Sequence, residues 1–156
     1  MIVPTIDTEL QILSSNRNEI ETKTSAKVLI SEESVIKICR NKTNTQTFFE
    51  ENNFGVPKRI TNFENVKYPV FLKPVDGSSS INTYKINNEK ELKFFTEYIP
   101  NVMVQEFISG EEYTVDAFLD FDSNIITIVP RQRIATRSGE IVKGKIVKDK
   151  EIIDDV

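Results

Sequence analysis

Apolar residues in the first fifty positions recur at helical spacing between two short apolar runs. Leu10, Ile12, Leu13 and Ile20 predict a helix over 7–21. Met1–Thr5 reads as the start of a strand, and 28–30 is a second short run. This βαβ-like order predicts that residues 1–30 are a piece of an α/β unit, either part of a longer domain or a small natural domain. Asp7 and Glu9 are read either as functional carboxylates or as favourable charges in the first helical turn.

Two further helices are expected before the glycine and proline at 55–57. Ser31 is the predicted N-cap of a helix that ends near Arg40, with acidic residues in its first turn. A second helix is predicted over 41–53, with Phe48 and Phe49 pointing inward. The glycine and proline that follow stop this helix.

Beyond Pro57 the pattern changes to short runs of β-branched and aromatic residues, which predict strands. One helix is expected among them, over 89–98, and a hairpin turn at Asp122-Ser123-Asn124. The fold class predicted is α+β, with helices covering an antiparallel sheet. The expected strands are 70–73, 81–86, 102–107, 112–119, 125–129 and 132–136.

The stretch YPVFLKPVDGSSSIN at 68–82 carries the clearest chemistry. A strand places Lys73 at its end as a point charge, and the small-residue loop that follows lets backbone N–H groups approach phosphate oxygens. The alternative is a lysine followed by an ordinary surface turn. A phosphate loop is the functional interpretation, although the sequence is not a Walker motif.

Composition narrows the class of protein further. The chain has 156 residues, 38% of them hydrophobic and 28% charged, with a net charge of −4, which argues against general nucleic-acid binding. No run approaches the roughly 20 apolar residues that a membrane helix needs, so no membrane association is expected. The N-terminus lacks the pattern of a signal peptide, and a lone Cys39 fits a reducing cytoplasm, where we place the protein. The absence of histidine excludes serine–histidine or zinc–histidine chemistry within these residues.

Three blocks taken together indicate a family. In order they are CRNKTNTQTFFEENNFGVPK, FLKPVDGSSSI and MVQEFISGEEYTVD. This ordered set resembles the ATP-grasp superfamily, and most closely the carbamoyl-phosphate-synthase-large-subunit-like branch of its carboxylate–amine ligases. The resemblance implies residues 1–30 as the end of a pre-ATP-grasp domain, 31–108 as a first lobe and 109–156 as the start of a second. It thus implies a partial ATP-grasp fold.

The resemblance also implies a role for particular residues. Lys42 and Lys73 match the two lysines that neutralise ATP phosphates, and Glu112 matches an acid that binds the ribose. Gln105 stands where the family often has glutamate beside the adenine amino group, and it offers an acceptor oxygen without the charge. The remaining residues implied in nucleotide binding are those of the loop, Asp76, Gly77, Ser78, Ser79 and Ser80, and those of the adenine hinge, Glu106, Phe107 and Ile108.

The implied function is the ATP-binding portion of a ligase. Such an enzyme activates a carboxylate or bicarbonate as an acyl phosphate for attack by an amine or ammonia. ATP and Mg²⁺ are the implied cofactors, with the Mg²⁺ ligands expected outside this chain. Glu151, Asp154 and Asp155 are read as a frayed tail rather than as ion ligands.

The alternatives are a non-catalytic nucleotide-binding or interaction module and a plain structural domain. From this chain alone we expect weak or undetectable ATP binding without turnover. The full-length protein is expected to take small carboxylate and amine substrates. An unpaired sheet edge favours a homodimer.

Overall fold

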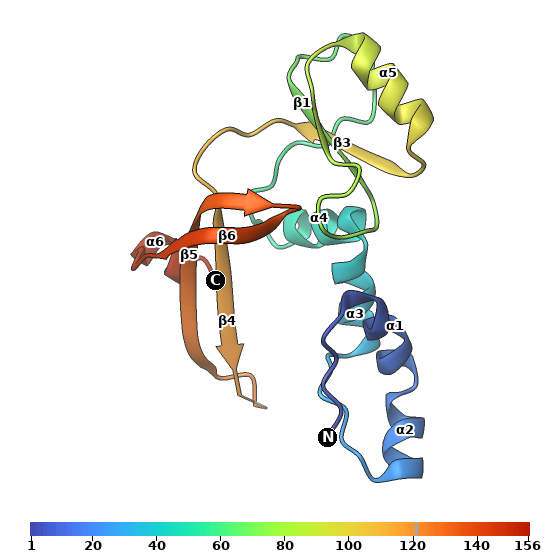
Figure 1. Ribbon diagram of the computed structural model, residues 1–156, viewed down its shortest axis with the longest axis vertical. Helices are drawn as coiled ribbons and strands as arrows, with labels where there is room; N and C mark the ends of the chain where they lie inside the picture. The colour runs from blue at the N-terminus through green and yellow to red at the C-terminus, as the bar shows by residue number, and fades with distance from the viewer. Residues whose placement is uncertain (121) are drawn as a thin grey trace. The chain divides into compact units, whose positions relative to one another are not determined.

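The computed structural model describes residues 1–120 and 122–156, which form two compact units (Figure 1). The first unit is Met1–Phe107 and the second is Ile108–Val156. Each contains a three-stranded antiparallel sheet, so the α+β class with antiparallel sheets is confirmed. The strands belong to two separate sheets, where the sequence suggested one. The assignment of residues 1–30 to a pre-ATP-grasp domain stays a prediction.

The N-terminal segment forms two helices instead of the single predicted one. They are α1 (Asp7–Ser15) and α2 (Arg17–Thr24), and the break between them is at Asn16. The side chain of Asn16 donates to the Ile12 carbonyl oxygen at 2.8 Å, and such local bonds compete with helix continuation. Ile2, before these helices, and Val28, after them, form a parallel β-bridge, which agrees with the predicted βαβ-like order.

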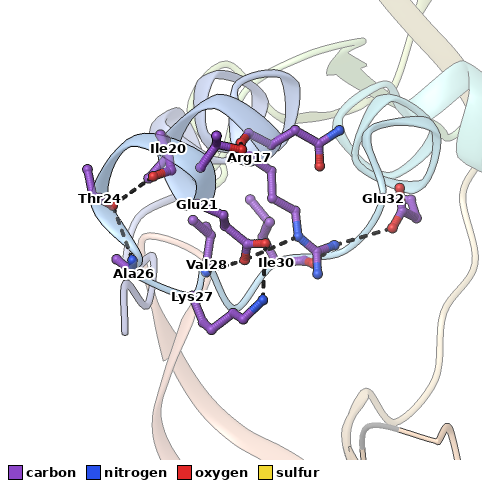
Figure 2. A network of polar contacts seen from close by, with 11 residues as sticks. Arg17, Ile20, Glu21, Thr24, Ala26, Lys27, Val28, Ile30 and Glu32 are labelled. Atoms are coloured by element: carbon purple, nitrogen blue, oxygen red, sulfur yellow. Dashed lines mark hydrogen bonds and ion pairs between the residues drawn. The ribbon is translucent and has the colours of Figure 1, made fainter.

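The Glu21 carboxylate joins α2 to the segment that follows it (Figure 2). It accepts a 2.9 Å hydrogen bond from the Val28 backbone N–H, and Lys27 and Arg17 lie at 3.6 and 3.8 Å. The backbone bond, followed by the two positive charges, lowers the pKa of Glu21 although partial burial opposes the shift. Arg17 also reaches Glu32 at 3.3 Å, which connects α2 to the chain entering the next helix.

Helices α3 (Glu33–Arg40) and α4 (Lys42–Glu51) lie next in the chain. The prediction of Ser31 as N-cap was wrong by one residue, because Glu32 occupies that position without a side-chain bond. Asn41 separates the helices, since its side-chain oxygen caps α4 by accepting from two backbone N–H groups at 3.0 Å.

The inward placement of two phenylalanines of α4 was also wrong. Phe48 and Phe49 are 43% and 38% exposed. Instead, Gln46 is the buried residue of this helix, at 4% exposure. A polar side chain therefore occupies the position where the sequence pattern led us to expect an aromatic one.

The first sheet has the order β2-β1-β3 and packs one face against helix α5 (Figure 1). Val70 and Leu72 of β1 point to this face and are fully buried. Strand β2 is shorter than predicted, because residues 81 and 82 are in a turn and the strand begins only at Tyr84. The bounds are β1 (Val70–Pro74), β2 (Tyr84–Ile86), α5 (Glu89–Tyr98) and β3 (Val102–Glu106), and the core consists of Val70, Leu72, Ile86, Leu92, Ile99 and Val104.

The second unit is a meander with the order β4-β5-β6. The two strands predicted over 125–136 are one strand that continues through Pro130. The Pro130 carbonyl accepts a hydrogen bond from the Val147 N–H just beyond the end of the β5–β6 ladder. The N–H that proline lacks would lie on the same side, so its absence removes no hydrogen bond from that ladder. The bounds are β4 (Tyr113–Leu119), β5 (Ile125–Arg137), β6 (Glu140–Ile146) and α6 (Lys150–Asp154).

Two further features of the second unit bear on the predictions. The turn between β4 and β5 is where it was expected, with Asn124 bonded through its backbone and side chain to Asp120. Strand β6 was not predicted, and the predicted frayed tail is the short helix α6, whose N-cap is Asp149. In the described part of the chain, no helix has the length and apolar character needed to cross a membrane.

Candidate functional site

The side of the first sheet that faces away from α5 forms one wall of a pocket. Strand alternation puts Lys73 on this face, and its antiparallel partner is Met103. Gln105 lies on the same face, two residues along β3. Helices α3 and α4 and the segment 55–57 supply the other walls. The pocket has a volume of about 370 Å³ and is lined by Cys39, Lys42, Thr45, Gln46, Phe49, Gly55, Val56, Pro57, Lys73, Met103 and Gln105.

Two of the predicted site residues, Lys42 and Lys73, therefore meet in this pocket. Burial lowers the pKa of Lys73, and the positive charge of Lys42 lowers it further. Burial also lowers the pKa of Lys42, although Asp76 partly opposes that shift. Partly desolvated cations that repel each other are stabilised by an anion placed between them. The pocket is thus suited to a multiply charged anion.

The predicted phosphate loop is attached to the pocket through the first of these lysines. The Lys42 ammonium donates to the Gly77 carbonyl oxygen at 2.8 Å. The backbone N–H of Lys42 donates to the Val75 carbonyl oxygen at 2.9 Å. Arg40 forms a 2.8 Å ion pair with Asp76, whose carboxylate also accepts from the Gly77 N–H at 2.7 Å. No local pattern in the sequence pointed to Arg40, because its partner Asp76 lies 36 residues away.

The loop itself depends on backbone conformations that few residues adopt readily. Gly77 has a φ of +113°, and Ser79 and Ser80 are left-handed at 58° and 53°. Asp76, Gly77 and Ser78 line a second hollow of about 340 Å³. All five loop residues from 76 to 80 are exposed. The expectation that this loop is the most mobile part of its lobe stays a prediction.

Replacing Gly77 with alanine is expected to destabilise the loop by about 1 kcal/mol, because alanine disfavours a positive φ. A Cβ atom at this position meets nothing within 4 Å, so the cost is purely conformational. Chemical denaturation followed by circular dichroism measures it. Gly55→Ala is the matched control, since Gly55 has equal space without the positive φ. Equal stability changes in both variants would contradict the assignment of strain to Gly77.

At the far end of the pocket, Gln105 and Gln46 form a buried pair of amides. Each is 4% exposed, and the Gln105 Nε2 donates to Gln46 Oε1 at 2.8 Å. Gln46 Nε2 in turn donates to Glu50 Oε1 at 2.7 Å and to the Pro57 carbonyl at 3.0 Å. The sequence reading missed Gln46. The only signal available was an amide placed four residues after Lys42 and four before Glu50 on one helix face.

The predicted adenine hinge lies directly after Gln105. The backbone N–H of Glu106 donates to Lys58, and its carboxylate accepts from the Lys58 N–H at 2.8 Å, so both groups already have partners. The Phe107 ring lies under the Lys85 ammonium at 4.2 Å from its centroid. Ile108 is 61% exposed and begins the second unit.

The remaining predicted site residue, Glu112, belongs to the second unit. Its carboxylate lies 3.2 Å from Arg133 Nε. The role of this acid in ribose binding stays a prediction. Among residues 1–120 and 122–156 no three His, Cys, Asp or Glu side chains are grouped as a metal site would require. Asp154, near the C-terminus, pairs with Lys150.

Comparison with known proteins identifies the family. A family model of the ATP-grasp domain matches residues 39–156. The chain belongs to the ATP-grasp family. The resemblance to the ATP-grasp superfamily is therefore confirmed, and the matched residues include both pocket lysines.

Several curated relatives are D-alanine–D-alanine ligases. The protein of this name from Leptospira interrogans serogroup Icterohaemorrhagiae serovar copenhageni (strain Fiocruz L1-130) is 44% identical over 89 residues, which cover 54% of this chain and 24% of the relative. That from Aquifex aeolicus (strain VF5) is 26% identical over 120 residues, or 72% of this chain and 39% of the relative. The chain thus spans well under half the length of these relatives.

Solved structures share the fold. The L-amino acid ligase from Bacillus licheniformis superimposes with a TM-score of 0.72 at 16% identity, over 96% of this chain and 38% of that one. The D-alanine–D-alanine ligase from Bacillus anthracis complexed with ATP gives 0.63 at 17% identity, over 91% and 50%. These likenesses establish the arrangement of the elements as that of a partial ATP-grasp fold.

Proposed function

We propose that this chain is the ATP-binding portion of an ATP-grasp ligase. The observation that carries the proposal is the meeting of two partly buried lysines and a buried glutamine in one pocket of about 370 Å³. Lys42 and Lys73 bind phosphate oxygens, and Gln105 contacts the base. A pocket of this size suits a small organic ligand. A relative of the same fold is described as complexed with ATP, which supports this choice of nucleotide.

In the proposed reaction, a carboxylate oxygen attacks the γ-phosphorus of ATP, the bond to the bridging oxygen breaks, and ADP leaves. The acyl phosphate that forms is then attacked by an amine, with loss of phosphate. The lysines contribute by neutralising charge on the phosphates and by positioning them, which carries most of a phosphoryl transfer. The Lys42 ammonium also donates to the Gly77 carbonyl oxygen, which keeps the glycine-rich loop beside the proposed phosphate site. Mg²⁺, when bound, would neutralise part of the phosphate charge, and the residues that would hold it are expected outside this chain.

The carboxylate substrate is proposed from the relatives. Their names, D-alanine–D-alanine ligase and L-amino acid ligase, favour an amino-acid carboxylate. Bicarbonate with ammonia, as in carbamoyl-phosphate synthases, stays the sequence-based prediction. A cytoplasmic location, a homodimer and Mg²⁺ ligands outside this chain are likewise kept as proposals.

Titration of the isotope-labelled chain with ATP, AMP and tripolyphosphate, followed by nuclear magnetic resonance, tests the proposal. We expect chemical-shift changes centred on Lys42, Lys73 and Gln105, with ATP binding more tightly than either fragment, because only ATP fills both the cationic and the amide ends. Weak affinity is expected, and this method detects it. Shift changes without a centre at Lys42, Lys73 and Gln105, or none at all, would refute the proposal.

A further inference from the structure

The two buried amides of the pocket belong to a chain of hydrogen bonds with a fixed direction. Its far end consists of the Glu50 carboxylate and the Pro57 carbonyl, which both receive a bond from Gln46. A carboxylate and a carbonyl only accept hydrogen bonds. The amide nitrogen of Gln46 must therefore face these two acceptors, and its oxygen must point the other way, toward Gln105.

The same logic fixes the amide of Gln105. Because Gln46 presents its oxygen, Gln105 must present its nitrogen, and the bond between them is 2.8 Å long. The oxygen of Gln105 is then turned away from Gln46. In the described part of the chain, no donor reaches that oxygen. The oxygen is nevertheless not sealed from solvent. Since Gln105 is 4% exposed and lines the pocket, the pocket provides this access.

An amide with a fixed direction can distinguish two kinds of purine. Adenine presents an amino donor beside a ring acceptor, whereas hypoxanthine presents a keto acceptor beside a ring N–H donor. A glutamine that turns freely matches either edge by exchanging its oxygen and nitrogen. A glutamine whose oxygen is held toward the base matches the amino group and opposes the keto group.

We propose that Gln46 is a positioning residue that makes the pocket selective for a nucleotide with an amino group on its base. Gln46 touches Gln105 and acts on the base only through it. The hydrogen bonds from Gln105 through Gln46 to Glu50 and the Pro57 carbonyl form a relay, and the two acceptors at its far end set its direction. This inference rests on the proposed function, because it presupposes that Gln105 contacts the base.

The expected result is a difference between ATP and inosine triphosphate, which differ at the base edge. We expect the unsubstituted chain to bind ATP roughly tenfold more tightly, since inosine triphosphate would bring two acceptors together. In Gln46→Leu, Gln105 is free to turn, and the two affinities should approach one another within about twofold. In Gln46→Leu/Gln105→Glu, a carboxylate that only accepts hydrogen bonds should restore the preference without any relay.

Isotope-labelled chain titrated with each nucleotide gives these affinities. Asn44→Leu is the matched control, an amide-to-leucine change at an exposed position of the same helix, and it should keep the preference. A second readout does not depend on any variant folding. The side-chain amide protons of Gln105 should exchange with solvent at least roughly tenfold more slowly than those of exposed Gln11.

The outcomes separate the two proposals. Shift changes from neither nucleotide overturn the proposed function and the relay together. Binding of ATP and inosine triphosphate with equal affinity to the unsubstituted chain overturns the relay alone. A further outcome is that Gln46→Leu weakens the binding of both nucleotides by the same factor and that adding Gln105→Glu does not rescue it. Gln46 would then have a purely structural role, and the relay would be overturned. Fast exchange of the Gln105 amide protons does the same.

Discussion

Lys73→Met is expected to weaken ATP binding by about 2–3 kcal/mol, the range of a lost hydrogen bond between a charged donor and a charged acceptor. The same change should leave the unliganded chain as stable as before or more stable by about 0.5–1 kcal/mol, because solvent still screens this partly exposed group. Burial and the charge of Lys42 lower the pKa of Lys73, so its protonated form is disfavoured in the folded chain. Methionine keeps most of the apolar stem and removes that charge.

The sign of the pH effect follows from the lowered pKa. Below the folded pKa, Lys73 is charged in both states, and the folded state bears the cost of keeping it so. As the pH rises through the folded pKa toward that of an unfolded lysine, the folded state loses its proton first and stability increases. Lys73→Met should remove this rise in stability at alkaline pH.

Calorimetric titration with ATP and thermal unfolding between neutral and alkaline pH measure the two halves of this prediction. Lys90→Met is the matched control, since Lys90 is exposed on α5, which packs on the face of the sheet opposite the pocket. It should change ATP affinity little. Unchanged ATP affinity in Lys73→Met, or an equal loss in both variants, would remove Lys73 from the phosphate site.

Local patterns in the sequence were sufficient to predict the parts of the fold that depend on local chemistry. The alternation in β1, the helix over 89–98 and the turn near Asn124 each follow from residues within a few positions of one another. The same is true of the lysine at the end of β1, because a strand end and a glycine-rich loop are adjacent in the chain. These features need no distant partner.

The errors have a common physical cause, which is that tertiary contacts decided them. Phe48 and Phe49 are apolar, yet Gln46 is the buried side chain of α4 because it has three hydrogen-bond partners in the fold. Strand β6 contains Gly144 and two lysines, and only pairing with β5 makes it a strand. The strands predicted over 125–129 and 132–136 are one, because the N–H that Pro130 lacks lies just beyond the end of the ladder with β6.

The candidate site divides in the same way. Lys42 and Lys73 were predicted from motif order and meet in one pocket, whereas Gln46 and Arg40 were missed because their partners are far away in sequence. Motif order also leaves open which backbone groups already have partners. The Glu106 N–H, counted among the hinge groups, is bonded to Lys58.

Leu72→Ala is expected to destabilise the first unit by about 2–5 kcal/mol, as for other leucines deleted from well-packed cores. Leu72 is fully buried against Ile86, Val104 and the residues of α5, one position before Lys73 and on the opposite face of β1. Urea unfolding followed through the amide resonances of residues 1–107 measures the loss within that unit. Leu29→Ala is the control at 44% exposure and should cost under about 1 kcal/mol. Similar losses in the two leucine variants would contradict the assigned core. Adjacent substitutions on β1 should therefore act oppositely, since Leu72 holds the sheet to its helix and Lys73 holds an uncompensated charge toward the pocket.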